Sequence, residues 1–358
     1  QNTHTHAKKN MSENPQSSST LEDSATKPNK PNNNRRRRGN KPQQGGPSIE
    51  GNEAWQRDMK KAIDANEKMH KERLDRSYQI DQNSKGKIKI TPLGGLGEIG
   101  GNICVFETET SAIVLDVGMS FPSEDMHGVD ILIPDFNYLR QIKKKIAGVI
   151  ISHAHEDHIG ALAYMFKEMQ FPLYATPLPL GMIANKFDEH GLKSHKKYFR
   201  PVEKRKVYKI GEFEVEWIHI THSIIDASSL AISTEAGTII HTGDFKIDHT
   251  PIDGFVSDLN RFSHYGEKGV LCLMSDSTNS YKEGITRSES TVGKTFDSIF
   301  AKSKGRVIMS TFSSNIHRVY QAIDYGLKYG RRVCVIGRSM ERNLFTAIDL
   351  GYIKLDKS

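Results

Sequence analysis

The chain is poor in cysteine and contains no long apolar run. Its 358 residues include only Cys104, Cys272 and Cys334, and this odd, scattered set excludes a disulfide framework. Each of the three lies in an apolar stretch, so we expect buried strand residues in a protein of the reducing cytoplasm. No apolar run approaches the roughly 18 residues that a membrane-spanning helix needs. The sequence therefore predicts a protein that does not cross a membrane.

Most of the chain is also nearly neutral in net charge. The formal charge is +7, but residues 1–86 hold 17 Lys and Arg against 11 Asp and Glu, whereas residues 87–358 hold 33 against 32. Residues 1–52 are polar and almost free of apolar side chains, so they cannot bury enough surface to offset chain entropy. We expect a disordered basic leader over residues 1–52 and a charged helical linker over residues 53–84.

Two features of this leading part leave alternatives open. Arg35 to Arg38 form a run that can bind RNA phosphates or partners in RNA degradation, and it can equally be a solvated linker. Residues 55–77 carry Glu/Asp and Lys/Arg neighbours at i,i+3 and i,i+4 spacing, which favours a helix. Its apolar stripe is thin, so the helix is either solvated or an assembly element.

From Lys85 onward the pattern is that of a compact α/β domain. Residues 87–95 and 102–118 resemble strands, the second segment being a hairpin that turns near Glu109. Residues 146–152 form a short continuous apolar run, which is typical of a strand buried on both faces. A helix is expected over residues 159–169, and further strands are expected within residues 211–222, 228–234, 237–245 and 269–276.

After Asp276 the pattern alternates between helix and strand. Helices are expected at 290–303, 316–330 and 340–351, and strands at 306–311 and 332–337, which is the rhythm of a parallel α/β unit. We place the boundary between residues 85–286 and residues 287–358. The second segment has few strands, so we expect the sequence to be a piece of a longer protein.

The stretch "VIISHAHEDHIG", residues 149–160, sets three histidines and two acids directly after a buried strand. His153 and His155 are two apart, so both side chains can point the same way, and Asp157 and His158 follow where the chain turns into a helix. Imidazole and carboxylate ligands without thiolates suit a catalytic Zn²⁺ or Mn²⁺ site. Two ions about 3.5–4 Å apart can polarise a phosphoryl group together. A charged surface turn is the alternative.

Further ligands are needed, and two strand ends offer them. His222 closes one predicted strand, and Asp244 closes another with a carboxylate that can bridge two cations. Asp116 ends a third strand and suits a hydrogen bond to a ligand histidine. His219 should face away from His222 and is assigned to packing, and His241 is treated as structural.

Several segments together resemble the ribonuclease J family of β-CASP nucleases. The His-x-His-x-Asp-His motif alone is similar to the whole metallo-β-lactamase superfamily, which includes lactonases and thioesterases. Seven further segments of the chain restrict the resemblance to the ribonuclease J family. They are "ITPLGGLGEIGGN", "VLDVGMSFP", "ILIPDF", "HTGDFKID", "SDSTNS", "TFSSNIHR" and "GRSM". It implies an αββα metallo-β-lactamase sandwich with an inserted α/β β-CASP domain, here incomplete.

The resemblance also implies roles for individual residues. One zinc would be bound by His153, His155, His222 and Asp244, and a second by Asp157, His158 and Asp244, with Asp116 and Asp276 as supporting strand-end acids. Asp157, His158 and Asp244 would be catalytic. The implied cofactors are two Zn²⁺ per chain, with Mn²⁺ as the alternative.

The implied activity is 5′-to-3′ exoribonuclease with endonuclease activity, in mRNA decay and rRNA maturation. The substrate would be RNA, preferably with a 5′-monophosphate, and the full-length protein would be a homodimer or homotetramer. Ser314, Asn315, Ile316 and His317 start a predicted helix, whose free N–H groups can bind phosphate, although plain capping also explains Ser and Asn there. A small-molecule metallohydrolase and a non-catalytic RNA-binding scaffold remain alternatives.

Overall fold

The computed structural model describes residues 53–76 and 86–355. The predictions for residues 1–52, for Arg35 to Arg38 and for residues 77–84 lie outside this part. Helix α1 spans Glu53–Arg76, so the helix predicted over residues 55–77 forms, and its role as a linker stays a prediction. The described side chains of α1 are exposed, with Trp55 at 57%. The chain divides into two units, Gln1–Lys61 and Ala62–Ser358, and the sheets and the site belong to the second. No described helix combines the length and apolar character of a membrane span.

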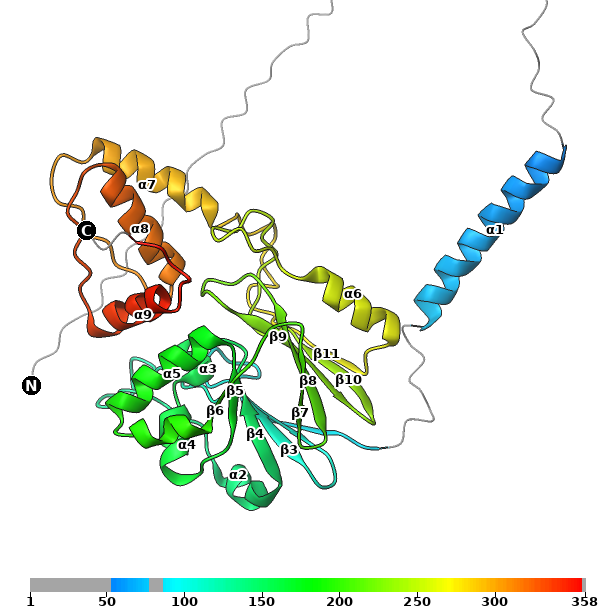
Figure 1. Cartoon of the computed structure of the whole chain (residues 1–358), viewed down its shortest axis with the longest axis horizontal. Coiled ribbons are helices and arrows are strands. Elements are labelled where there is room, and N and C mark those ends of the chain that lie inside the picture. The colour runs from blue at the N-terminus through cyan, green and yellow to red at the C-terminus, as the bar shows by residue number, and fades with distance from the viewer. Residues whose placement is uncertain (1–52, 77–85, 356–358) are drawn as a thin grey trace, which may run out of the picture. The chain divides into compact units, whose positions relative to one another are not determined.

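Two mixed β-sheets form the centre of this unit (Figure 1). The first has the order β1 to β6: Lys89–Gly94, Ile103–Glu107, Ala112–Leu115, Ile146–Ile150, Leu173–Ala175 and Phe199–Pro201. The second has the order β11-β10-β9-β8-β7: Cys272–Met274, Gly237–His241, Ser228–Thr234, Phe213–His219 and Val207–Ile210. Strands β3 to β6 run parallel, whereas β1, β2 and β3 form an antiparallel meander.

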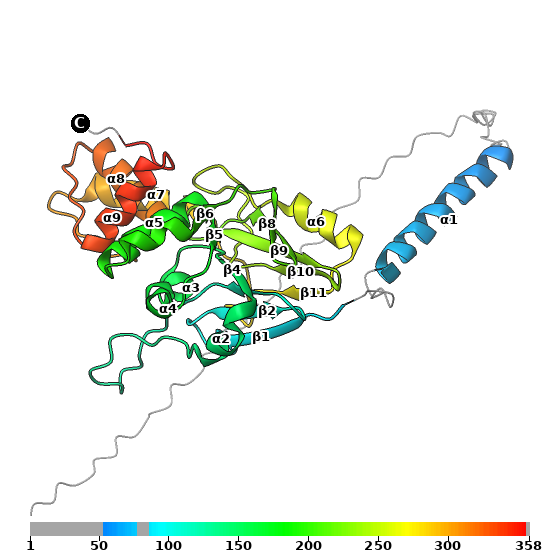
Figure 2. The same ribbon diagram turned by 60° about the horizontal axis from the view of Figure 1, so that its bottom comes forward.

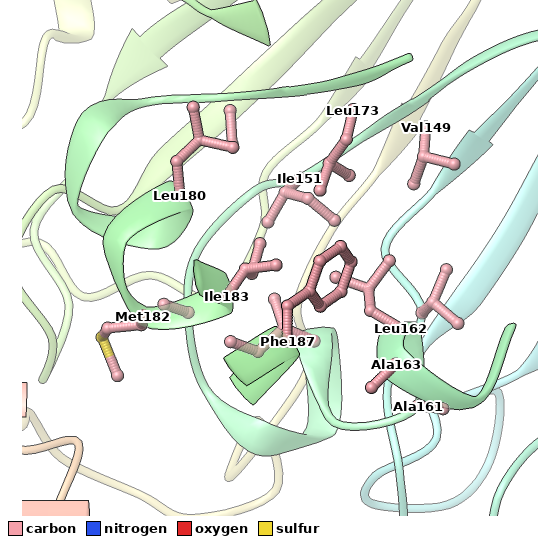
Figure 3. Packing of buried hydrophobic residues seen from close by; sticks show 14 of the residues in the cluster. Val149, Ile151, Ala161, Leu162, Ala163, Leu173, Leu180, Met182, Ile183 and Phe187 are labelled. Carbon is pink, nitrogen blue, oxygen red and sulfur yellow. The ribbon is translucent and has the colours of Figure 1, made fainter. Parts of the chain in front are cut away.

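Helices cover the outer face of each sheet. They are α2 (Asn137–Ile142), α3 (Glu156–Ile159), α4 (Leu162–Glu168), α5 (Pro177–Glu189) and α6 (Leu259–Lys268), with 3-10 turns at Lys143–Lys145 and Lys193–Tyr198. Phe187 of α5 points toward Ile151 and Leu162 in the core beneath the first sheet (Figure 3). Helix α6 lies along the second sheet, where Tyr265 packs on Ile218 (Figure 2).

The core between the sheets completes a four-layer sandwich. Phe106 and Ile150 of the first sheet pack with Trp217 and Leu230 of the second in one fully buried cluster. Strand β4 sends Val149 to the helix side and Ile150 to the second sheet, so the prediction that it is buried on both faces is confirmed. The αββα arrangement predicted from the resemblance is confirmed.

The C-terminal part differs from the prediction in its strands. Helices α7 (Ser290–Lys302), α8 (Ile316–Lys328) and α9 (Arg338–Asp349) form as expected. The strands predicted over residues 306–311 and 332–337 do not form, because neither segment has a hydrogen-bonded strand partner among the described residues. Their apolar side chains stay outside the core, with Ile308 87% exposed and Ile336 83% exposed.

The expectation of a buried cysteine in a strand is confirmed for Cys104 and is wrong for Cys272 and Cys334. Cys104 is buried in β2, but Cys272 lies half-buried at the edge strand β11 and Cys334 is exposed in the unpaired segment. Contacts join the C-terminal helices to the sandwich, including the hydrogen bond from Asn185 Nδ2 to Thr346 Oγ1 at 2.9 Å. The boundary at residues 286 and 287 stays a prediction.

Candidate metal centre

The HAHEDH segment is a tight turn between β4 and α4, held mainly by backbone contacts. His155 is extended, with φ −71° and ψ 153°, and α3 begins at the next residue. The carbonyl oxygens of the turn accept N–H donors from neighbouring loops: Asn102 N to Asp157 O (3.0 Å), Val117 N to His158 O (2.8 Å) and Met119 N to Glu156 O (3.1 Å). A Cβ at Gly118 would lie 1.6 Å from Asp157 O. This close approach requires glycine at position 118.

Three imidazole nitrogens and one carboxylate oxygen converge at the strand ends. His155 Nδ1 lies 3.1 Å from His153 Nε2 and 3.0 Å from His222 Nε2. Asp244 Oδ2 lies 3.9 Å from His153 Nε2 and 3.8 Å from His222 Nε2. Four ligands about 2.0–2.1 Å from a tetrahedral cation stand roughly 3.3 Å from one another. The observed separations bracket that value, so these four residues fit one cation.

A second group shares the same carboxylate. His158 Nε2 lies 3.6 Å from Asp157 Oδ2 and 3.4 Å from Asp244 Oδ2, and the ligand atoms of this group lie within 4.8 Å of one another. Asp244 is therefore the one residue common to both groups. The six side chains that the sequence predicts as ligands are thus brought together in one place, from three separate segments of the chain.

Asp116 supports this arrangement from behind His158. Its Oδ2 lies 2.8 Å from His158 Nδ1 and accepts the Ser152 hydroxyl at 2.7 Å, while its Oδ1 accepts the Ser152 N–H at 2.8 Å. Asp116 has φ +54°, a left-handed conformation that Asp tolerates better than most residues. A carboxylate at Nδ1 leaves Nε2 directed at the shared centre.

Burial and neighbouring charges set the protonation of the cluster. Burial and adjacent histidines lower the pKa of His155 to about 3. Burial, together with the charges of His158 and Lys246, lowers the pKa of His222 to about 4. Burial alone would raise the pKa of Asp244, but the hydrogen bond and charge of His158 lower it to about 2. Neutral imidazoles beside an ionised carboxylate at neutral pH are the donor set that a divalent cation requires.

His158 differs from the other histidines. Burial opposes its protonation, but the Asp116 and Asp244 carboxylates outweigh that effect and raise the pKa of His158 well above its ordinary value. The pKa of Asp157 is also raised, mainly by burial. The second group is therefore electrostatically distinct from the first.

Other predicted residues lie outside these groups. Asp276 contacts none of the ligand side chains in the described residues; its carboxylate accepts the Thr278 N–H at 2.7 Å, and its own N–H donates to Thr242 Oγ1 at 2.9 Å. His219 contacts Lys204 Nζ and Phe255 O, and His241 Nδ1 accepts the Gly243 N–H. Neither histidine belongs to a ligand group.

The predicted phosphate-binding segment is largely occupied by its own capping contacts. Asn315 caps α8 by accepting the Arg318 N–H, and the Ile316 N–H donates to Ser314 O at 2.8 Å. The Ile316 side chain is buried in the core. The assignment of Ile316 to substrate stays a prediction, and in this structure both its side chain and its N–H have partners within the fold. His317 lies beside Asp253, with its Nε2 buried and lacking a hydrogen-bond partner in the described residues.

Three contacts in or directly beside the turn were not predicted from the sequence. They are the Asn102 amide on Asp157, the Ser152 hydroxyl on Asp116 and the Lys186 ammonium on Glu156, the last at 2.7 Å. The partners are 30 to 55 residues apart in the chain, so no local spacing marks them. Only the tertiary fold brings them together.

Comparisons with known proteins bear on the fold and the family of the chain. The metallo-β-lactamase superfamily model matches residues 96–271, and the model of the ribonuclease J β-CASP domain matches residues 304–358. A solved protein of unknown function from Enterococcus faecalis V583 aligns with a TM-score of 0.54 and 21% identity, over 75% of this chain and 69% of that chain. That likeness supports the fold alone.

Curated relatives are much closer in sequence. Ribonuclease J of Helicobacter pylori (strain ATCC 700392 / 26695) is 66% identical over 301 residues, which is 84% of this chain and 44% of the relative. Ribonuclease J of Synechocystis sp. is 46% identical over 269 residues, which is 75% of this chain and 42% of the relative. The chain thus spans less than half the length of these relatives. With a metallo-β-lactamase fold followed by β-CASP sequence, it belongs to the ribonuclease J family.

Proposed function

We propose that this chain carries the metal centre of a metal-dependent ribonuclease that acts as a 5′-to-3′ exoribonuclease and also as an endonuclease. The observation that carries the proposal is the pair of ligand groups joined at Asp244, because a shared carboxylate can place two cations on one phosphodiester. Cytoplasmic mRNA decay and rRNA maturation are the proposed settings.

His153, His155, His222 and Asp244 would bind one cation, and Asp157, His158 and Asp244 the other. Zn²⁺ is proposed for both, with Mn²⁺ as the alternative that His/Asp ligands also accept. Bound cations would supply Lewis-acid stabilisation of the negative charge that develops on the phosphoryl group. Asp116 orients His158 for this task through the contact at Nδ1.

Asp157 and Asp244 also have chemistry of their own. Their side chains are 29% and 32% exposed, whereas the side chain of His153 is fully buried. Both carboxylates are therefore accessible to incoming water and substrate. We propose that Asp157 accepts a hydrogen bond from the attacking water and so aims it at phosphorus.

A pocket of about 230 Å³ adjoins the centre, lined among others by His222, Lys246 and His317. A larger cavity of about 1240 Å³ shares His317 with it but includes none of the six ligand residues. We assign the substrate to the smaller pocket because it contains the ligand residue His222. Its lining also holds three further basic side chains and four carboxylates. Of the four residues predicted to bind substrate, His317 is the one proposed to contact RNA here.

The proposed partners follow the family. RNA with a 5′-monophosphate is the proposed substrate, the full-length protein is proposed to be a homodimer or homotetramer, and the basic leader is proposed to bind partners in RNA degradation. Lactonase or thioesterase activity on the same fold is the competing outcome of the test below.

The test uses a full-length protein that carries this sequence, freed of metal with a chelator and then given Zn²⁺ or Mn²⁺. Cleavage of 5′-monophosphorylated RNA into mononucleotides should return with the metal. It should be lost in the Asp157→Ala/His158→Ala variant and kept in His127→Ala, which alters an exposed histidine far from the motif in sequence. Hydrolysis of a thioester without RNA cleavage would contradict the proposal.

A further inference from the structure

Asn102 contacts both residues that belong only to the second ligand group. It lies at the end of a glycine-rich segment, directly before β2. Its Nδ2 donates to Asp157 O at 3.1 Å and to Asp157 Oδ2 at 3.2 Å, and the same nitrogen lies 3.1 Å from His158 Nε2. One amide group thus touches two of the three atoms that would bind the second cation.

The Asn102 side chain is held in a defined orientation. The backbone N–H of Asn102 donates to Asp157 O at 3.0 Å, and the backbone carbonyl of Asn102 accepts the Gly118 N–H at 2.9 Å. A Cβ at Gly95, which has φ +84°, would lie 2.4 Å from Asn102 Oδ1. Exchanging the amide oxygen and nitrogen would direct an oxygen at two oxygens of Asp157, which is repulsive. The contacts therefore fix the NH₂ group toward the turn.

Asp157 and His158, which belong only to the second group, are each contacted by a side chain outside that group. Asp116 contacts His158 at the ring nitrogen that faces away from the centre. The Asn102 amide donates a hydrogen bond to the Asp157 carboxylate. In both groups the ligand atoms also lie close to one another, around His155 in the first group and around His158 in the second. A donor of this kind restricts the rotation of a partly exposed carboxylate.

We infer that Asn102 is a positioning residue of the second cation site, which it prepares by fixing the Asp157 carboxylate beside His158. This inference depends on the cation site proposed above. Loss of a hydrogen bond that orients a ligand typically weakens metal affinity about 10- to 100-fold. Removal of the amide should therefore weaken the binding of the second cation by about that factor and leave the affinity for the first cation unchanged.

The test is an equilibrium titration of the metal-free chain with Co²⁺, followed by visible absorption. His222→Ala identifies the step that belongs to the first site, and His158→Ala identifies the second. Asn102→Ala removes the amide, and Asn102→Leu removes the donor while keeping similar volume. The control is Asn137→Ala, because Asn137 Nδ2 also donates to a carboxylate, Asp135 Oδ2 at 2.9 Å, outside the centre.

Weaker binding of the second Co²⁺ in both Asn102 variants, with an unchanged first step and an unchanged control, would support the inference. Wild-type affinity for the second Co²⁺ in Asn102→Leu would show that side-chain volume matters and the hydrogen-bond donor does not, which would overturn the inference. Unchanged or tighter second binding in Asn102→Ala would also overturn it. If wild type binds no Co²⁺ in either step, the proposed centre itself fails, and this inference fails with it. Melting curves of the metal-free variants identify any that do not fold.

Discussion

The Asp116 carboxylate and the His158 imidazole lie 2.8 Å apart, and both are almost fully buried. This pair ties the end of β3 to the turn after β4. It also directs His158 Nε2 toward Asp244. Asp116 and His158, which is a proposed metal ligand, are therefore held together in the folded chain.

Asp116→Asn should weaken the binding of the second cation about 10- to 100-fold while the chain stays folded. Asn adopts the left-handed conformation of position 116 as readily as Asp, so the change removes charge without straining the backbone. The affinity is measured by Co²⁺ titration, with Asp135→Asn, an exposed carboxylate, as control. Equal affinity in both variants and in wild type would refute the role of the pair.

Gly118→Ala should destabilise the fold by about 1–3 kcal/mol or more, because its Cβ would overlap the Asp157 carbonyl. Urea unfolding monitored by circular dichroism gives the free energy of unfolding. The matched control is Gly266→Ala in α6, where nothing lies within 4 Å of the new Cβ. That control should gain up to about 1 kcal/mol from helix propensity. Equal stabilities of the two variants would contradict the close approach.

Glu216 should make stability depend on acid pH. Its carboxylate is 1% exposed and accepts hydrogen bonds from Arg261 at 2.8 and 2.7 Å and from Tyr265 at 2.6 Å. Burial would raise the pKa of Glu216, but these donors outweigh it and hold the pKa below the ordinary 4.5. The folded chain thus binds fewer protons here than the unfolded chain does. The stabilisation is present above about pH 4.5 and is lost as pH falls through the folded pKa.

Glu216→Gln should accordingly cost on the order of 2 kcal/mol at pH 7, and the difference from wild type should shrink toward pH 3. Denaturant unfolding across this pH range measures both effects. Glu168→Gln, which removes an exposed pair with Arg140, should cost less than about 1 kcal/mol. A difference from wild type that grows as the pH falls would have the wrong sign for this account.

Much of the centre could be predicted because each ligand follows a strand. The turn at His153 to His158 succeeds a buried apolar run, and His222 and Asp244 occupy the same place after β8 and β10. The ends of strands on the two facing sheets meet in space. The positions of these residues after predicted strands were therefore enough to predict that they lie together. Asn102 was missed because its contact with Asp157 depends on how a glycine-rich loop folds back over the turn.

The C-terminal strands could not be read correctly from local pattern. Residues 306–311 and 332–337 have the apolar, β-branched composition of strands, but a strand also needs a neighbour to accept and donate its hydrogen bonds. No described segment supplies that neighbour, and Ile308 and Ile336 stay exposed. Composition predicts the tendency of a segment, whereas pairing depends on the rest of the fold.

The most direct test of the account is the metal content of the protein purified without added metal, measured by elemental mass spectrometry. The account predicts close to two zinc or manganese ions per chain, close to one in His158→Ala, and two in the His127→Ala control. Absence of both metals from the wild type, or an unchanged content in His158→Ala, would contradict it.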